Sequence, residues 1–82
     1  MTTFFEKLDQ RAQSIDSLLC VGLDPHPEDL PEQSSAAAKD FCLRLIEATQ
    51  AYALAFKPNA AFFEALGPAG WEALQSVIAA VP

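Results

Sequence analysis

Two short apolar runs in this chain each end in one ionisable residue followed directly by proline. The first run, residues 18–23, stops at Asp24-Pro25, and the second, residues 53–56, stops at Lys57-Pro58. Proline has no amide hydrogen for a sheet ladder, so each strand must end at that point. Runs that are apolar at every position are typical of strands in a parallel sheet covered by helices. The pattern therefore predicts two buried parallel strands, each with a charged residue at its C-terminal end.

Helical patterns surround the two predicted strands. Thr3 followed by Glu6 is a capping-box pattern and predicts a helix over about residues 3–14. A serine cap and a continuous apolar face predict a second helix over about residues 34–50. A third helical stretch is expected behind Gly67-Pro68. Its predicted core face consists of Trp71, Leu74, Val77 and Ile78.

The expected order of elements is helix, strand, helix, strand, helix, which indicates an α/β fold with a parallel sheet. Two parallel strands do not make a finished sheet, so we expect the 82 residues to form one partial domain, residues 1–82, that is incomplete at its C-terminus. The reading frame is expected to continue past Pro82 into a third strand, because loops from helix to strand in such folds are short.

Charge and hydropathy exclude several classes of partner. The formal net charge is −6, and the five Lys and Arg residues are scattered, so a nucleic-acid partner is not expected. The same shortage of cations means that the phosphate of a small substrate would be held largely by other residues. Neither a signal-peptide pattern nor a membrane-length apolar run is present, and a cytoplasmic protein without a membrane partner is expected.

Other residues with reactive side chains have simpler interpretations. Cys20 and Cys42 are isolated in the sequence and are expected to be two buried, reduced thiols. His26 lies in an acidic loop without a second ligand at metal spacing, so a solvated histidine and no metal site are predicted. Asn59 and Glu64 are close enough to the second strand to reach its end, although a surface position suits Glu64 better.

Asp24 and Lys57 are the strongest candidates for function. Polar residues at the C-terminal ends of parallel strands line the active site in barrels of alternating strands and helices. The alternative is that the two charges pair with each other or point to solvent. A charge at the end of a buried run is costly unless a partner or a substrate satisfies it, which favours the functional interpretation.

Three motifs carry a resemblance to a known family. They are C-V-G-L-D-P at residues 20–25, A-F-K-P-N-A-A-F-F-E at residues 55–64, and G-x-x-G-W-E-A-L at residues 67–74. In this order and spacing the sequence resembles the opening of orotidine 5′-phosphate decarboxylases, in the bacterial and archaeal branch that has the F-K-P-N form. The resemblance covers nearly the whole chain but only about a third of a typical barrel of ~250 residues.

The resemblance implies the first two βα units of a (β/α)₈ TIM barrel, from a homodimeric, cofactor-free enzyme that converts orotidine 5′-phosphate to UMP. It implies that Asp24 binds a ribose hydroxyl, and that Lys57 binds the ribose and joins a network of lysines and aspartates. The family's proton-donating lysine lies in an Asp-x-Lys-x-x-Asp motif on the third strand. That motif is expected after Pro82, so no catalytic residue is assigned within this chain, and the 82 residues alone are expected to be inactive.

Two alternatives remain open at this stage. A related enzyme acting on a sugar phosphate, such as a hexulose-phosphate synthase or a keto-gulonate phosphate decarboxylase, would also carry an aspartate after its first strand. The F-K-P-N-A-A-F-F-E stretch argues against it. The second alternative is that the chain is a non-catalytic piece of a barrel that serves dimerisation or binding.

Overall fold

A computed structural model describes residues 2–82 of the chain. Its elements alternate between helix and strand in the predicted order, with two additions: a 3₁₀ turn, η1, after the first strand and a short helix, α3, after the second. The elements are α1 (Phe4–Ile15), β1 (Cys20–Leu23), η1 (Pro27–Asp29), α2 (Ser35–Thr49), β2 (Ala55–Pro58), α3 (Ala60–Glu64) and α4 (Pro68–Ala80).

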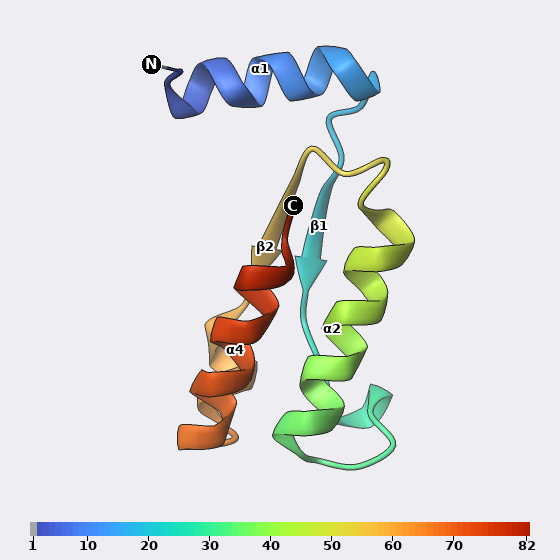
Figure 1. The fold of residues 1–82 in the computed structure, drawn as a ribbon. Coiled ribbons are helices and arrows are strands. Elements are labelled where there is room, and N and C mark those ends of the chain that lie inside the picture. The colour runs from blue at the N-terminus through green and yellow to red at the C-terminus, as the bar shows by residue number, and fades with distance from the viewer. Residues whose placement is uncertain (1) are drawn as a thin grey trace.

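The two strands pair in parallel, as predicted, and α2 connects them (Figure 1). Cys20 pairs with Ala55 at the start of the ladder, and Leu23 pairs with Pro58 at its end. Beyond the ladder, the amide of Asn59 donates a hydrogen bond to the carbonyl of Leu23 over 3.3 Å. The C-terminal ends of β1 and β2 are therefore fixed side by side.

One face of the sheet carries the core. α2 and α4 pack against each other and against this face, and α3 packs on α4. Phe63 of α3 is the largest fully buried side chain, and it fills the space beneath the helices. The buried cluster consists of Leu23, Ala38, Cys42, Ile46, Phe63, Ala73, Leu74 and Val77.

The predicted core face of α4 is partly wrong. Leu74 and Val77 are buried, but Trp71 is 49% exposed and Ile78 is 55% exposed. The buried stripe runs instead through positions 70, 73, 74 and 77, which is the spacing of a single helix face. Gly70 sets this face, because a Cβ atom there would lie 1.8 Å from the carbonyl oxygen of Phe63. α4 thus approaches α3 through a glycine, and this rotates Trp71 toward the surface.

The prediction of two buried thiols is also wrong for one of them. Cys42 on α2 is buried, whereas Cys20 is exposed. β1 begins at Cys20, later than predicted, and Leu18 before it is 82% exposed. The reason is that, in residues 2–82, helices cover only one face of the sheet. Cys20 lies on the other face, although its sequence run is apolar throughout.

α1 lies across the end of the sheet where the strands begin (Figure 1). Its capping box is present as predicted: the Thr3 hydroxyl accepts from the amide of Glu6, and the Glu6 carboxylate accepts from the amide of Thr3. None of its residues is buried. Arg11 joins α1 to the rest of the molecule by donating to the carbonyl of Gln50, over 2.6 Å, and to that of Ala53, over 3.3 Å. No helix in residues 2–82 has the length and apolar character needed to cross a membrane.

Candidate active-site face of the sheet

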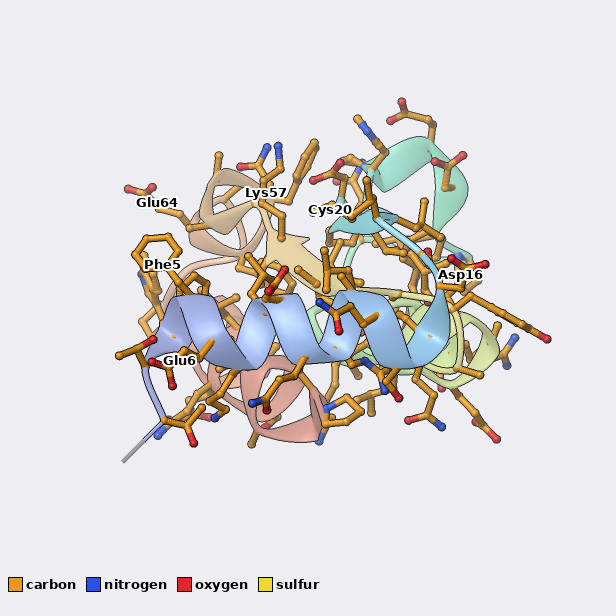
Figure 2. The ribbon with its side chains drawn as sticks, turned by 90° about the horizontal axis from the view of Figure 1, so that it is seen from above. Phe5, Glu6, Asp16, Cys20, Lys57 and Glu64 are labelled. Atoms are coloured by element: carbon orange, nitrogen blue, oxygen red, sulfur yellow. The ribbon has the colours of Figure 1, made fainter. Side chains whose placement is uncertain are left out.

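The uncovered face of the sheet brings Asp24 and Lys57 to the same side. Lys57 is the register partner of Gly22, and partners in a parallel pair project from the same face. Figure 2 shows Lys57 and Cys20 on the side of the sheet opposite α4. Asp24 follows Gly22 by two positions, so strand alternation returns it to this face. The two residues expected to act together therefore lie on one surface, at the C-terminal ends of neighbouring strands.

Gly22 provides the space that the Asp24 carboxylate occupies. A Cβ atom built on Gly22 would lie 3.0 Å from Oδ2 of Asp24, which is closer than ordinary van der Waals contact. The carboxylate thus folds back over the strand, on the side where Lys57 projects from β2. Gly22 was not singled out from the sequence, and its only signal there is its position two residues before the aspartate.

Asp24 and Lys57 do not form an ion pair with each other. Within residues 2–82 the salt bridges join His26 to Glu28 and Arg44 to Asp40, and neither includes the strand-end charges. Lys57 is exposed and Asp24 is half-buried. The alternative that the two charges pair with each other is therefore not observed. Both charges remain available to a ligand on this face.

The Asp24 carboxylate influences a second ionisable group, on the helix behind the sheet. Burial, and to a smaller extent the negative charge of Asp24, together raise the pKa of the Cys42 thiol to about 11. Both causes disfavour a thiolate. Cys42 is consequently a protonated thiol near neutral pH, and it behaves as a packing residue rather than a nucleophile.

The loops that follow the two strands also touch each other. The ring of His26, after β1, meets the ring of Phe62, in α3, edge to face with centroids 4.5 Å apart. Nδ1 of His26 lies 3.8 Å from a carboxylate oxygen of Glu28, a contact that is ionic only when the imidazole is protonated. His26 was predicted to be solvated, and its side chain is 47% exposed, but it also makes this contact between loops. No local sequence pattern predicts it.

The remaining candidates have structural roles or face solvent. The side-chain oxygen of Asn59 accepts from the amide of Ala61 and so caps α3. Glu64 is exposed and points outward at the margin of the molecule (Figure 2). Gly67 has φ 76°, a backbone conformation suited to glycine, and leads into α4 as the turn expected there.

The described residues offer no cluster of metal ligands: no group of three or more His, Cys, Asp or Glu side chains converges within residues 2–82. A groove of about 410 Å³ lies elsewhere, on the outer side of α2, where Leu30, Phe41 and Leu45 supply much of its apolar wall. Neither Asp24 nor Lys57 lines it. The charged groups that the sheet face offers are therefore one carboxylate and one ammonium, beside the exposed thiol of Cys20.

Comparison with curated proteins finds relatives that share the name orotidine 5′-phosphate decarboxylase. The chain is 45% identical over 78 residues to an orotidine 5′-phosphate decarboxylase from Roseiflexus castenholzii, covering 92% of this chain and 29% of that protein. It is 47% identical over 78 residues to the enzyme of this name from Leptospira interrogans, covering 92% of this chain and 28% of that protein. No family model matches the chain.

Solved structures give the same result. The chain superposes with a TM-score of 0.94 and 49% identity on a crystal structure from Toxoplasma gondii described as an orotidine-monophosphate decarboxylase, covering 99% of this chain and 28% of that one. The Leishmania donovani OMP decarboxylase gives a TM-score of 0.84 and 55% identity, covering all of this chain and 30% of that one.

These comparisons confirm the resemblance seen in the three motifs, and they confirm the fold class. Residues 2–82 have the architecture of the first two βα units of a TIM barrel. The chain spans less than a third of the length of the relatives described above.

Proposed function

We propose that this chain supplies the first two βα units of an orotidine 5′-phosphate decarboxylase, which forms UMP for pyrimidine nucleotide synthesis. The observation that carries this assignment is the shared face of Asp24 and Lys57. The two charges stand at the C-terminal ends of adjacent parallel strands, where ligands bind in such folds, and they are not paired with each other. The similarity to decarboxylases along the whole chain supports it.

The proposed roles follow from the chemistry of the two side chains. The Asp24 carboxylate accepts a hydrogen bond from a ribose hydroxyl, and the Lys57 ammonium donates to the ribose while balancing nearby carboxylates. Both bind a part of the substrate that does not react. Binding energy from such remote groups holds the pyrimidine ring in place for the chemical step.

The chemical step itself needs a different group. When the carbon–carbon bond breaks, carbon dioxide leaves and the electron pair stays on the pyrimidine carbon. A fixed ammonium stabilises this developing carbanion and then protonates it. Because Lys57 is assigned to the ribose, we assign the proton donor to a lysine in an Asp-x-Lys-x-x-Asp motif outside residues 1–82. No cofactor enters this mechanism.

Two broader features belong to the same proposal. A homodimer of the whole enzyme and a cytoplasmic location would both suit an enzyme of nucleotide synthesis. Sedimentation of the whole enzyme would test the first, and fractionation of cells would test the second.

The assignment can be tested with a hybrid enzyme. In this hybrid, residues 1–82 replace the corresponding part of the Leptospira interrogans decarboxylase, to which the chain is 47% identical. We expect the hybrid to decarboxylate orotidine 5′-phosphate, and the 82-residue chain alone to show no turnover above a control without enzyme. Asp24→Ala and Lys57→Ala should each lower kcat/KM of the hybrid at least about tenfold, or roughly 1.4 kcal/mol.

A matched control is the surface pair Asp40 and Arg44, whose side chains are 64% and 80% exposed. Asp40→Ala and Arg44→Ala should leave the kinetics of the hybrid unchanged. If the hybrid folds but Asp24→Ala and Lys57→Ala behave like these controls, the two residues have no role in substrate binding. A folded hybrid without activity would instead favour a non-catalytic barrel piece.

A further inference from the structure

The contact between His26 and Phe62 joins the two segments that carry the candidate charges. His26 belongs to the loop after β1, and Phe62 belongs to the short helix after β2. Their rings meet at a centroid distance of 4.5 Å and an interplanar angle of 66°, which is an edge-to-face arrangement. Such pairs have a preferred geometry, because the positive edge of one ring faces the negative face of the other.

The backbone couples the His26 ring closely to Asp24. The amide of His26 donates to the carbonyl of Asp24 over 2.8 Å, across the single residue Pro25, which is buried. The carbonyl of His26 in turn accepts from the amide of Asp29 over 2.9 Å. These bonds hold the backbone from Asp24 to Asp29 in a compact turn, so a contact that restrains His26 also restrains the backbone that carries Asp24.

Phe62 is coupled to the end of β2 in a similar way. Its amide donates to the carbonyl of Asn59 over 3.3 Å, and the side chain of Asn59 caps the same helix through the amide of Ala61. Only Pro58 separates Asn59 from Lys57. The ring contact therefore closes a loop of interactions that starts at one charged residue and ends at the other.

We propose that His26 is a positioning residue, whose ring contact with Phe62 fixes the separation of Asp24 and Lys57 on the sheet face. Beyond the last ladder pair, Leu23 and Pro58, the direct link between the two strand ends is the hydrogen bond from Asn59 to the Leu23 carbonyl, and at 3.3 Å it is long. The ring pair adds a second link, between the loop after β1 and the helix after β2. Because this role rests on the proposed decarboxylase function, kinetics and geometry are tested separately.

The kinetic test uses the hybrid enzyme described above. His26→Ala should lower kcat/KM about fivefold, mainly through a higher KM, because the residues that it positions bind the ribose. His26→Phe keeps a ring against Phe62 and should remain within about twofold of the unsubstituted hybrid. Phe62→Ala should match His26→Ala, and the double variant should be no worse than either, since both changes break one contact.

Two further variants distinguish positioning from general structural damage. In a Lys57→Ala background, His26→Ala should cause a smaller additional loss than in the unsubstituted hybrid, because only Asp24 is left to be positioned. Glu28→Gln removes the ionic contact with His26 and should leave the kinetics unchanged. An equal loss from His26→Ala with and without Lys57, or a fivefold loss from Glu28→Gln, would overturn the assignment.

The geometric test uses the 82-residue chain and does not depend on activity. NMR of the unsubstituted chain should show nuclear Overhauser effects between the ring protons of His26 and Phe62. It should also show a ring-current shift of the His26 ring protons that disappears in Phe62→Leu. The absence of both signals would overturn the ring contact itself. Both signals in the chain, together with a folded but inactive hybrid, would retain the contact and reject the decarboxylase function.

Discussion

The helix α1 and the unit formed by β1 to α4 differ in how far their apolar side chains are buried. Both contain helices with an apolar face and a side-chain cap. In the β1 to α4 unit that face is buried against a sheet and a second helix, and Cys42 and Phe63 have no exposed surface. In α1 no residue is buried, and Phe5 is 77% exposed. The difference teaches that an amphipathic pattern specifies a helix and its apolar face, whereas burial depends on what lies opposite.

The largest effect should come from deleting a ring in each region. Phe63→Ala removes the largest buried side chain and should lower the free energy of unfolding by about 3–5 kcal/mol, enough to leave much of the chain unfolded. Phe5→Ala is the matched control and should cost less than about 0.5 kcal/mol. Urea unfolding followed by circular dichroism measures both changes. Similar losses for the two variants would mean that α1 is packed as firmly as the core.

A smaller effect should distinguish the buried thiol from the exposed one at high pH. The pKa of Cys42 is raised from 9.0 to about 11 by burial and by Asp24, so the folded chain keeps this proton where the unfolded chain releases it. Its contribution to stability is thus complete below about pH 9 and is lost as the pH rises toward 11. The loss between pH 8 and 10 should be about 1 kcal/mol.

The measurement compares the free energy of unfolding at pH 8 and pH 10 in three chains. Cys42→Ala should abolish the part of the pH dependence that comes from this thiol, while Cys20→Ser, which changes the exposed thiol, should retain it. Apart from the thiol that each variant removes, the groups that titrate in this range are common to all three chains. Identical slopes for Cys42→Ala and the unsubstituted chain would contradict the raised pKa.

The smallest effect should come from releasing α1. Arg11→Ala removes the two hydrogen bonds from α1 to the carbonyls of Gln50 and Ala53, and it should cost about 1 kcal/mol or less, because these contacts are largely exposed. The effect should be local. Amide exchange in residues 4–15 should become faster, while exchange in α2 and α4 should not change.

Arg44→Ala is the control for Arg11→Ala. Among the residues that the structure describes, Arg44 pairs only with Asp40, on the surface of α2, and its loss should change neither exchange nor stability measurably. If Arg11→Ala instead accelerates exchange throughout the chain, α1 and the β1 to α4 unit fold as one cooperative body. The contrast between the two regions would then be one of surface exposure alone.

The elements predictable from the sequence are those whose signals are local. Thr3 and Glu6 mark the start of α1 and a serine cap marks α2, and both appear in the structure. The second strand was predicted over residues 53–56, but β2 covers Ala55–Pro58, and Pro58 is the register partner of Leu23. The short helix α3 was not predicted, because five residues give no helical period to detect.

Burial was less predictable than the elements themselves. Cys20, Trp71 and Ile78 were placed in the core, yet all are exposed. Cys20 is exposed because no helix in residues 2–82 covers its face of the sheet, and the other two because Gly70 turns the adjacent stripe of α4 inward. These outcomes depend on neighbours that are distant in sequence, so apolar character at one position does not determine them.

The candidate site also has features that the sequence predicts locally and features that depend on distant residues. The strand-end positions of Asp24 and Lys57 follow from the prolines behind them, and the sequence alone located both. Their common face follows from the pairing of Gly22 with Lys57, which is a property of the register and not of either strand. The ring contact of His26 is equally non-local, because Phe62 reaches it only once the two strands have paired.

The register between β1 and β2 also has a consequence for synthesis on the ribosome. α1 carries both halves of its capping box within its first turn, so the local contacts that start this helix are complete as soon as it leaves the exit tunnel. β1 must wait, because Cys20 pairs with Ala55 and the whole of α2 is translated between them. At ordinary rates of translation this delay is roughly 2–7 s. During that time the apolar residues of β1 have no partner strand, and they are open to a chaperone or to another nascent chain.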